Sequence, residues 1–170
     1  SPSNPNVVEI EIEEDVNDSF KVEVETENCN LFLAKKALNV SIKESPAFIK
    51  NRLIASGIRP INNVVDISNY VMLEVGQPLH FYDADRLGNK ILVRMAKNDE
   101  KLTTLDNIER TLDEEDIVIT NGTEAIGLAG VMGGLSTEVE EDTKNIIIES
   151  AVFDGVKIRC TSKKIVRSEA

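Results

Sequence analysis

Glycine clustering in the segment from Gly122 to Gly134 constrains the fold of this chain more than any other feature. Five of the nine glycines fall within these thirteen residues. Glycine has no Cβ, so it permits backbone with positive φ and lets another group approach the peptide units closely. A strand that only had to pack in a core would carry Val or Ile instead. The segment therefore predicts either the wall of a binding pocket or a run of turns and bulges.

The spacing of these glycines argues against a phosphate-binding loop. Gly127, Gly130 and Gly133 follow one another at intervals of three residues, which matches neither the dinucleotide fingerprint nor the phosphate loop that ends in Lys-Ser or Lys-Thr. The acidic stretch 136–142 comes next, and it lacks the pattern of a helix N-terminus that would hold a pyrophosphate. We therefore expect no nucleotide binding at this loop.

Length and cysteine content limit the class of protein. A chain of 170 residues forms one domain or two small ones and buries about two thirds of its unfolded surface, enough for a core without disulfides. Cys29 and Cys160 lie far apart, and we expect both to be buried in a reduced environment. The sequence contains no signal peptide or long apolar stretch, so we expect a cytoplasmic protein without a membrane anchor.

Charge is unevenly distributed along the chain, whose net charge is −11. Residues 1–28 contain nine acidic side chains and one lysine, whereas the last fourteen residues contain five basic side chains and one acid. Nucleic-acid binding depends on Lys and Arg side chains that neutralise phosphates. The basic C-terminal stretch is consistent with an RNA-binding face, and equally with the solvated side of a helix.

Two helices in the first half of the chain are predicted from their end signals. Ser45 fits the N-cap and Pro46 the first turn of a helix that ends at Gly57. Asn63 fits the cap of a second helix, which runs to Gly76.

The remaining pattern is mostly that of short strands joined by hairpins. Strands are expected at residues 8–12, 20–24, 91–95, 117–120, 125–129 and 146–148, and a hairpin is expected over 102–112 with its turn at Asp106 and Asn107. Asp154 fits the cap of a final helix. Because the helices are grouped and do not alternate with strands, we expect an α+β fold with mixed, largely antiparallel sheets and three to four helices.

The sequence offers few residues for catalysis. His80 is the only histidine, and no closely spaced cysteines accompany it, so we expect no zinc site. The acidic clusters lack the regular spacing of a calcium loop. Glu149 follows three isoleucines at the end of a predicted strand, where a partly desolvated carboxylate needs a partner. That partner is an arginine, a set of backbone N–H groups or a ligand hydroxyl.

Six motifs follow one another along the chain: Gly57–Pro60, Asn63–Tyr70, Gly76–His80, Ala129–Gly134, Ile148–Ala151 and Arg167–Ala170. Together they closely resemble the editing region, the third and fourth domains, of the bacterial phenylalanyl-tRNA synthetase beta subunit. The resemblance implies an editing domain over residues 29–170, cut from a longer subunit. Residues 1–28 are then acidic N-terminal strands, part of the same unit or partly ordered.

The resemblance also implies an activity, the hydrolysis by a positioned water of tyrosine wrongly esterified to phenylalanine tRNA. No cofactor is implied for this fragment, because the parent synthetase uses ATP and magnesium elsewhere. The implied partners are the mischarged tRNA and the synthetase alpha subunit. Two alternatives remain open: a structural or tRNA-contacting module without activity in isolation, and a free-standing deacylase.

Particular residues receive roles from the same resemblance. The implied catalytic residues are His80, Glu149 and Asn69. The implied substrate-binding residues are Arg59, Ser68, Gly130, Gly133, Glu149, Ser168 and Ala170. Among them, Glu149 is expected to recognise the tyrosine hydroxyl, and His80 to orient substrate or water. A site that bonds this hydroxyl rejects the analogue lacking it by about 10⁴ to 10⁵.

Overall fold

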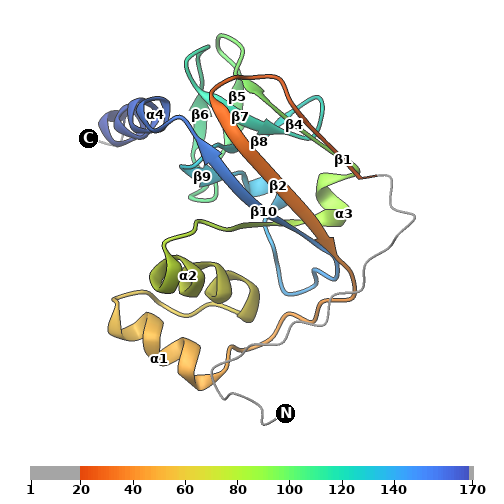
Figure 1. Cartoon of the computed structure of the whole chain (residues 1–170), viewed down its shortest axis with the longest axis vertical. Coiled ribbons are helices and arrows are strands. Elements are labelled where there is room, and N and C mark those ends of the chain that lie inside the picture. Colours follow the sequence, from red (N-terminus) through yellow and green to blue (C-terminus); the bar gives the residue numbers. More distant parts are fainter. Residues whose placement is uncertain (1–19, 169–170) are drawn as a thin grey trace.

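Two β-sheets form the body of the protein, whose computed structural model describes residues 20–168 (Figure 1). The larger sheet has the strand order β1-β4-β7-β8-β9, with bounds Lys21–Val24, Lys90–Met95, Ile117–Thr120, Ala125–Leu128 and Met132–Gly133. Its pairings are antiparallel except that of β1 with β4. The smaller sheet is antiparallel, in the order β2 (Cys29–Ala37), β10 (Ile146–Phe153) and β3 (His80–Asp83). A separate hairpin pairs β5 (Lys101–Thr103) with β6 (Glu109–Thr111).

Four α-helices accompany the sheets in the described part of the chain. They are α1 (Ala47–Ala55), α2 (Asn63–Val75), the short α3 (Ala84–Leu87) and α4 (Gly155–Ser168), with a 3₁₀ turn at Leu135–Thr137. In Figure 1, α1 and α2 lie together below the long strands β2 and β10, and α4 extends from the other end of β10. The prediction of an α+β fold with largely antiparallel sheets is confirmed.

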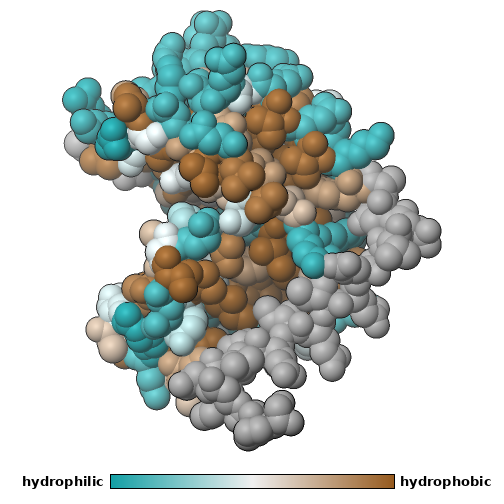
Figure 2. All heavy atoms as spheres, in the orientation of Figure 1, coloured by the Kyte–Doolittle hydropathy of each residue, from teal (hydrophilic) through white to brown (hydrophobic). Residues whose placement is uncertain are grey.

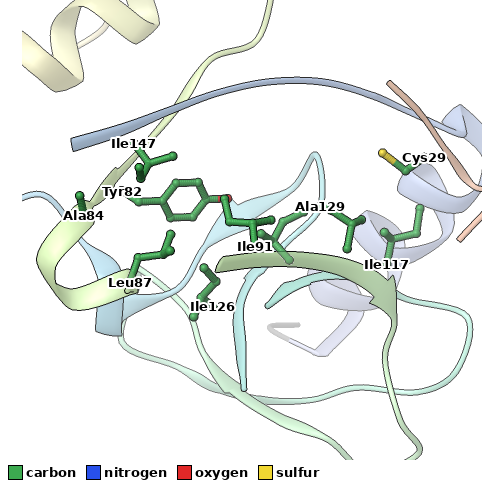
Figure 3. Packing of buried hydrophobic residues seen from close by; sticks show 11 residues of the cluster. Cys29, Tyr82, Ala84, Leu87, Ile91, Ile117, Ile126, Ala129 and Ile147 are labelled. Carbon is green, nitrogen blue, oxygen red and sulfur yellow. The ribbon is translucent and has the colours of Figure 1, made fainter. Parts of the chain in front are cut away.

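The three-stranded sheet is buried on both faces over part of its length, because successive residues of a strand point to opposite sides. Ile147 and Tyr82 face the five-stranded sheet and share a core with Ile91 and Ile126. Figure 3 shows Tyr82 in this cluster, with Ile147, Leu87 and Ile126 around its ring. The opposite face contributes Ile146 and Phe81 to a second core, which Val64 of α2 completes.

The helix ends differ in detail from the prediction. The N-cap of α1 is Pro46, and the buried Ser45 hydroxyl instead donates to Asp66 Oδ2 at 2.5 Å, which links the start of α1 to α2. The N-cap of α2 is Asn62, whose side chain accepts a hydrogen bond from the Val65 N–H at 3.0 Å. The predicted end of α2 is confirmed, since Gly76 is left-handed with φ of 70°.

Strand β2 was not predicted, and it pairs with β10 over nearly its whole length. It carries apolar side chains on both faces, with Phe32 and Ala34 packed against the core while Leu31 and Leu33 are exposed. That composition hides the alternation by which strands are recognised. Strand β10 likewise extends beyond the predicted Ile148 to Phe153.

Three other predictions have different outcomes. The strand expected at 20–24 is present as β1, an edge strand exposed on all four residues rather than half-buried. The strand expected at 8–12 lies outside the described residues. Cys29 is buried as expected, but Cys160 is exposed because it lies on the outer side of α4.

Candidate functional site

A cavity of about 600 Å³ opens where the two sheets meet. Its walls come from the segment 77–82, the glycine loop 127–133, the second half of β10 and the first turn of α4. This volume is in the range of small-molecule sites, about 300–1,000 Å³. Figure 2 shows the molecule hollowed at its edge between α4 and the helices α1 and α2.

Glu149 is the buried acidic group of this cavity, with 8% of its surface exposed. The Tyr82 hydroxyl donates a hydrogen bond to its Oε1. Oε2 has no hydrogen-bond or ionic partner among the described residues. Burial raises the pKa of the Glu149 carboxyl to about 7, although the Tyr82 hydrogen bond acts in the opposite direction. The partner of this carboxyl is therefore a phenol, and one oxygen remains available to a ligand.

His80 lies directly across the sheet from Glu149, because the two residues are register partners on β3 and β10. Its ring packs edge-on against Tyr82, with ring centroids 4.4 Å apart at 78°. Burial lowers the pKa of His80 to about 4. The imidazole is thus neutral at pH 7, and it has no hydrogen-bond partner within residues 20–168. A neutral imidazole both donates and accepts hydrogen bonds, so it can orient a water or an ester oxygen.

The glycines of the loop are needed chiefly for packing within the protein. A Cβ on Gly133 would lie 2.5 Å from His80 Cε1, and one on Gly134 would lie 2.4 Å from the Ile126 carbonyl oxygen. Gly130 has a φ of 68°, which other residues rarely adopt. The missing side chain of Gly133 therefore makes room for the imidazole, which stands between this glycine and the cavity.

The cavity brings together part of the residue set expected from sequence. Gly130, Gly133, His80 and Glu149 line it, whereas the expected residues Arg59, Ser68 and Asn69 do not. Arg59 is exposed in the segment after α1, and Ser68 and Asn69 lie on α2. The Ser68 hydroxyl donates to the Val65 carbonyl oxygen at 2.7 Å within its own helix.

Two further expected residues lie at the C-terminal limit of the described chain. Ser168 is the last residue of α4, and Ala170 lies outside the described residues. Their expected place at the rim of the pocket remains a prediction.

Tyr82 and Arg159 are cavity residues that the sequence interpretation missed. Tyr82 could have been found by strand periodicity, because it follows His80 by two residues and so points to the same face of β3. Arg159 carries no comparable signal, since a basic residue on a helix is usually solvated.

Among residues 20–168, no three His, Cys, Asp or Glu side chains are grouped so that they could hold a metal ion. No helix of the described chain is both long and apolar enough to cross a membrane.

Comparison with known proteins gives consistent matches. The family described as "B3/4 domain" matches residues 28–170. The phenylalanine–tRNA ligase beta subunit of Staphylococcus saprophyticus is 52% identical over 99% of this chain, and that of Clostridium tetani is 49% identical over 91%. The chain spans about a fifth of the length of these relatives, 21% and 20% respectively.

A solved structure shares the fold. It is an N-terminal fragment of the phenylalanyl-tRNA synthetase beta subunit from Pyrococcus horikoshii, with a TM-score of 0.59 and 12% sequence identity. The match covers 93% of this chain and 51% of that fragment. At this identity the likeness concerns the fold alone.

Proposed function

We propose, because this chain belongs to the B3/4 domain family, that it is the hydrolytic editing domain of a phenylalanine–tRNA ligase beta subunit. Its substrate in this proposal is phenylalanine tRNA that carries tyrosine by mistake. Residues 29–170 form the editing domain, and residues 1–28 precede it as an acidic segment. The alpha subunit is the partner through the longer chain, and ATP and magnesium act elsewhere in the ligase.

The observation that carries the proposal is Glu149, a buried carboxyl in an apolar cavity with one oxygen free. Tyrosine and phenylalanine differ by one hydroxyl, which a synthetic pocket shaped for phenylalanine rejects poorly. A second site that bonds the hydroxyl solves this problem, because phenylalanine would leave the carboxyl without a partner for Oε2. The cavity thus has the chemistry of a sieve that accepts tyrosine and spares phenylalanine.

The reaction needs no covalent intermediate. A water oxygen forms a bond to the ester carbonyl carbon, the bond from that carbon to the ribose oxygen breaks, and the ribose oxygen takes up a proton. His80 is neutral and unpaired in the described structure, so it is suited to orient this water or the ester. Arg59, Ser68 and Asn69 lie outside the cavity and are placed, in this proposal, along the terminal adenosine.

The proposal is tested with the intact pair of ligase subunits and phenylalanine tRNA charged separately with tyrosine and phenylalanine. The tyrosyl ester is expected to be hydrolysed and the phenylalanyl ester spared, with a ratio of rates that reaches about 10⁴ where the hydroxyl-bonding site alone discriminates. Equal rates for the two esters would contradict the proposal.

A second candidate function, contact with the RNA itself, is favoured by how the cations of α4 are distributed. Lys157 forms an ion pair with Glu115, and Lys164 bonds Asp113 at 2.9 Å and Asp116 at 2.7 Å. These two lysines fasten the helix to the turn before β7.

The other cations of the helix are unpaired. Arg159, Lys163 and Arg167 form no hydrogen bond or ion pair with any described residue. They recur every four residues, so they share one side of the helix. Arg159 lines the cavity, and all three line a second, shallower hollow beside it. This stripe leads away from the cavity and is suited to the phosphates next to an esterified 3′ end.

We expect the ligase with Lys163→Glu and Arg167→Glu to bind tRNA more weakly and with a shallower dependence on salt, lower by about one unit of slope per charge. Hydrolysis of a small tyrosyl ester should be unchanged. The matched control is Lys21→Glu with Lys43→Glu, two exposed lysines away from α4. An equal loss of tRNA binding in both double variants would reject a specific role for the stripe.

A further inference from the structure

Tyr82 and Glu149 form a buried pair that the general need for a hydroxyl-binding carboxyl does not explain. Tyr82 is 1% exposed, and its ring is enclosed by core residues of both sheets (Figure 3). Its hydroxyl reaches the edge of the cavity and donates to Glu149 Oε1. Burial, together with the nearby Glu149, raises the pKa of Tyr82 well above its ordinary value, so the phenol is the donor at every physiological pH.

The hydrogen bond has two physical consequences. An unheld carboxyl can rotate and present either oxygen, whereas a bonded Oε1 leaves Oε2 as the single acceptor for a ligand. A buried carboxylate without any donor also bears the full cost of desolvation. The resting cavity therefore keeps its carboxyl half satisfied and half available.

We propose that Tyr82 is a positioning residue for Glu149, which holds one carboxyl oxygen so that the other accepts the hydroxyl of the substrate tyrosine. This inference rests on the proposed function of the cavity. The ligand phenol does not displace the protein phenol in this arrangement. The two phenols bind the two oxygens of one carboxylate.

The charges around Glu149 support this assignment. On β3 it faces Tyr82 and the neutral His80, on β2 the thiol of Cys29 lies near, and α4 contributes Arg159 to the same cavity. Of these groups, Tyr82 is the one whose hydrogen bond lowers the pKa of Glu149 against the effect of burial. Its removal leaves burial unopposed, so the carboxyl stays protonated to higher pH.

The test replaces Tyr82 with phenylalanine in the intact ligase, and the matched control is Tyr70→Phe. Tyr70 is the other tyrosine of the chain and packs edge-on against Phe48 on the helices. Both changes remove one oxygen and keep the ring, so the contact of residue 82 with His80 is preserved. For Tyr82→Phe we expect kcat/KM for tyrosyl-tRNA at pH 7 to fall about tenfold to a hundredfold, the effect of losing a hydrogen bond to a charged group.

The pH profile distinguishes positioning from a general loss of structure. In Tyr82→Phe the midpoint of tyrosyl-ester hydrolysis should move to higher pH, and part of the activity should return as the pH is raised. Tyr70→Phe should keep the profile of the original enzyme. An unchanged midpoint in Tyr82→Phe, or tighter binding of tyrosine through removal of a competing phenol, would overturn the inference.

A third variant separates this inference from the proposed function. Glu149→Gln should remove the pH dependence, and adding Tyr82→Phe to it should cause little further loss, because the two residues act as one unit. If Glu149→Gln leaves hydrolysis intact, the proposed function fails. If it abolishes hydrolysis while the losses from the two substitutions simply add, only the role of Tyr82 fails.

Discussion

Replacement of Glu149 with glutamine is expected to slow the hydrolysis of tyrosyl-tRNA by the ligase about tenfold to a hundredfold. Glutamine keeps the shape of the side chain but replaces a charged acceptor by a neutral one, and hydrogen bonds to charged groups contribute about 1.5–3 kcal/mol. Because the amide carries no ionisable proton, hydrolysis should also lose the transition near pH 7 that the raised pKa of Glu149 predicts. Rates measured from pH 5.5 to 8.5 with purified mischarged tRNA check both effects.

The control for this prediction is Glu109→Gln. Glu109 is an exposed carboxylate on β6, outside the residues that line the cavity. Its replacement removes the same charge from the chain and should leave the rate and the pH profile unchanged. Undiminished hydrolysis in Glu149→Gln would show that this carboxyl does not read the substrate.

The helices and turns of this fold were predictable because their signals are local. Gly76 adopts the left-handed conformation that ends α2, and Asn107 has a φ of 63° in the predicted hairpin turn. Asp154 accepts hydrogen bonds from the Val156 and Lys157 N–H groups at 3.0 Å, as expected of the cap of α4. Each of these features depends on residues close together in sequence.

Pairing between distant strands was not predictable by such signals. Strand β2 carries apolar residues on both faces, and its partner β10 lies more than a hundred residues away. Nothing within Cys29–Ala37 specifies that partner, because register is set by the faces that both strands bury.

The candidate site shows the same division. The glycine loop and Glu149 were suspected from composition, but only the register of β3 with β10 places His80 opposite Glu149. The role of Gly133 also depends on tertiary contact, since the imidazole of a distant strand occupies the space of its missing Cβ. Residues on α2 such as Asn69 lie outside the cavity, because that helix covers the other face of the three-stranded sheet.

The stability of the 170-residue chain should respond to pH in opposite ways when His80 and Glu149 are replaced singly. The pKa of Glu149 is raised from 4.5 to about 7 in the folded protein, so its contribution to stability is lost as pH rises from about 4.5 to 7. The pKa of His80 is lowered from 6.5 to about 4, so its contribution is lost as pH falls from about 6.5 to 4. Each effect reaches about 3 kcal/mol over its range.

These two effects offset each other in the unmodified chain. At pH 5.5 the unfolded chain carries its proton on His80 and the folded chain carries it on Glu149, so folding changes the number of bound protons at these two groups by nearly zero. No slope of stability with pH is therefore expected from the pair between about pH 4.5 and 6.5.

Single substitution should reveal each slope. Relative to the unmodified chain, Glu149→Gln should lose about 3 kcal/mol of unfolding free energy as pH falls from 6.5 to 4, because only the His80 effect remains. His80→Gln should gain a similar amount as pH falls from 7 to 4.5. Urea unfolding at half-unit steps of pH measures both curves. Parallel curves for the three proteins would mean that neither group is desolvated in the folded state, and the dry cavity on which hydroxyl recognition depends would have to be abandoned.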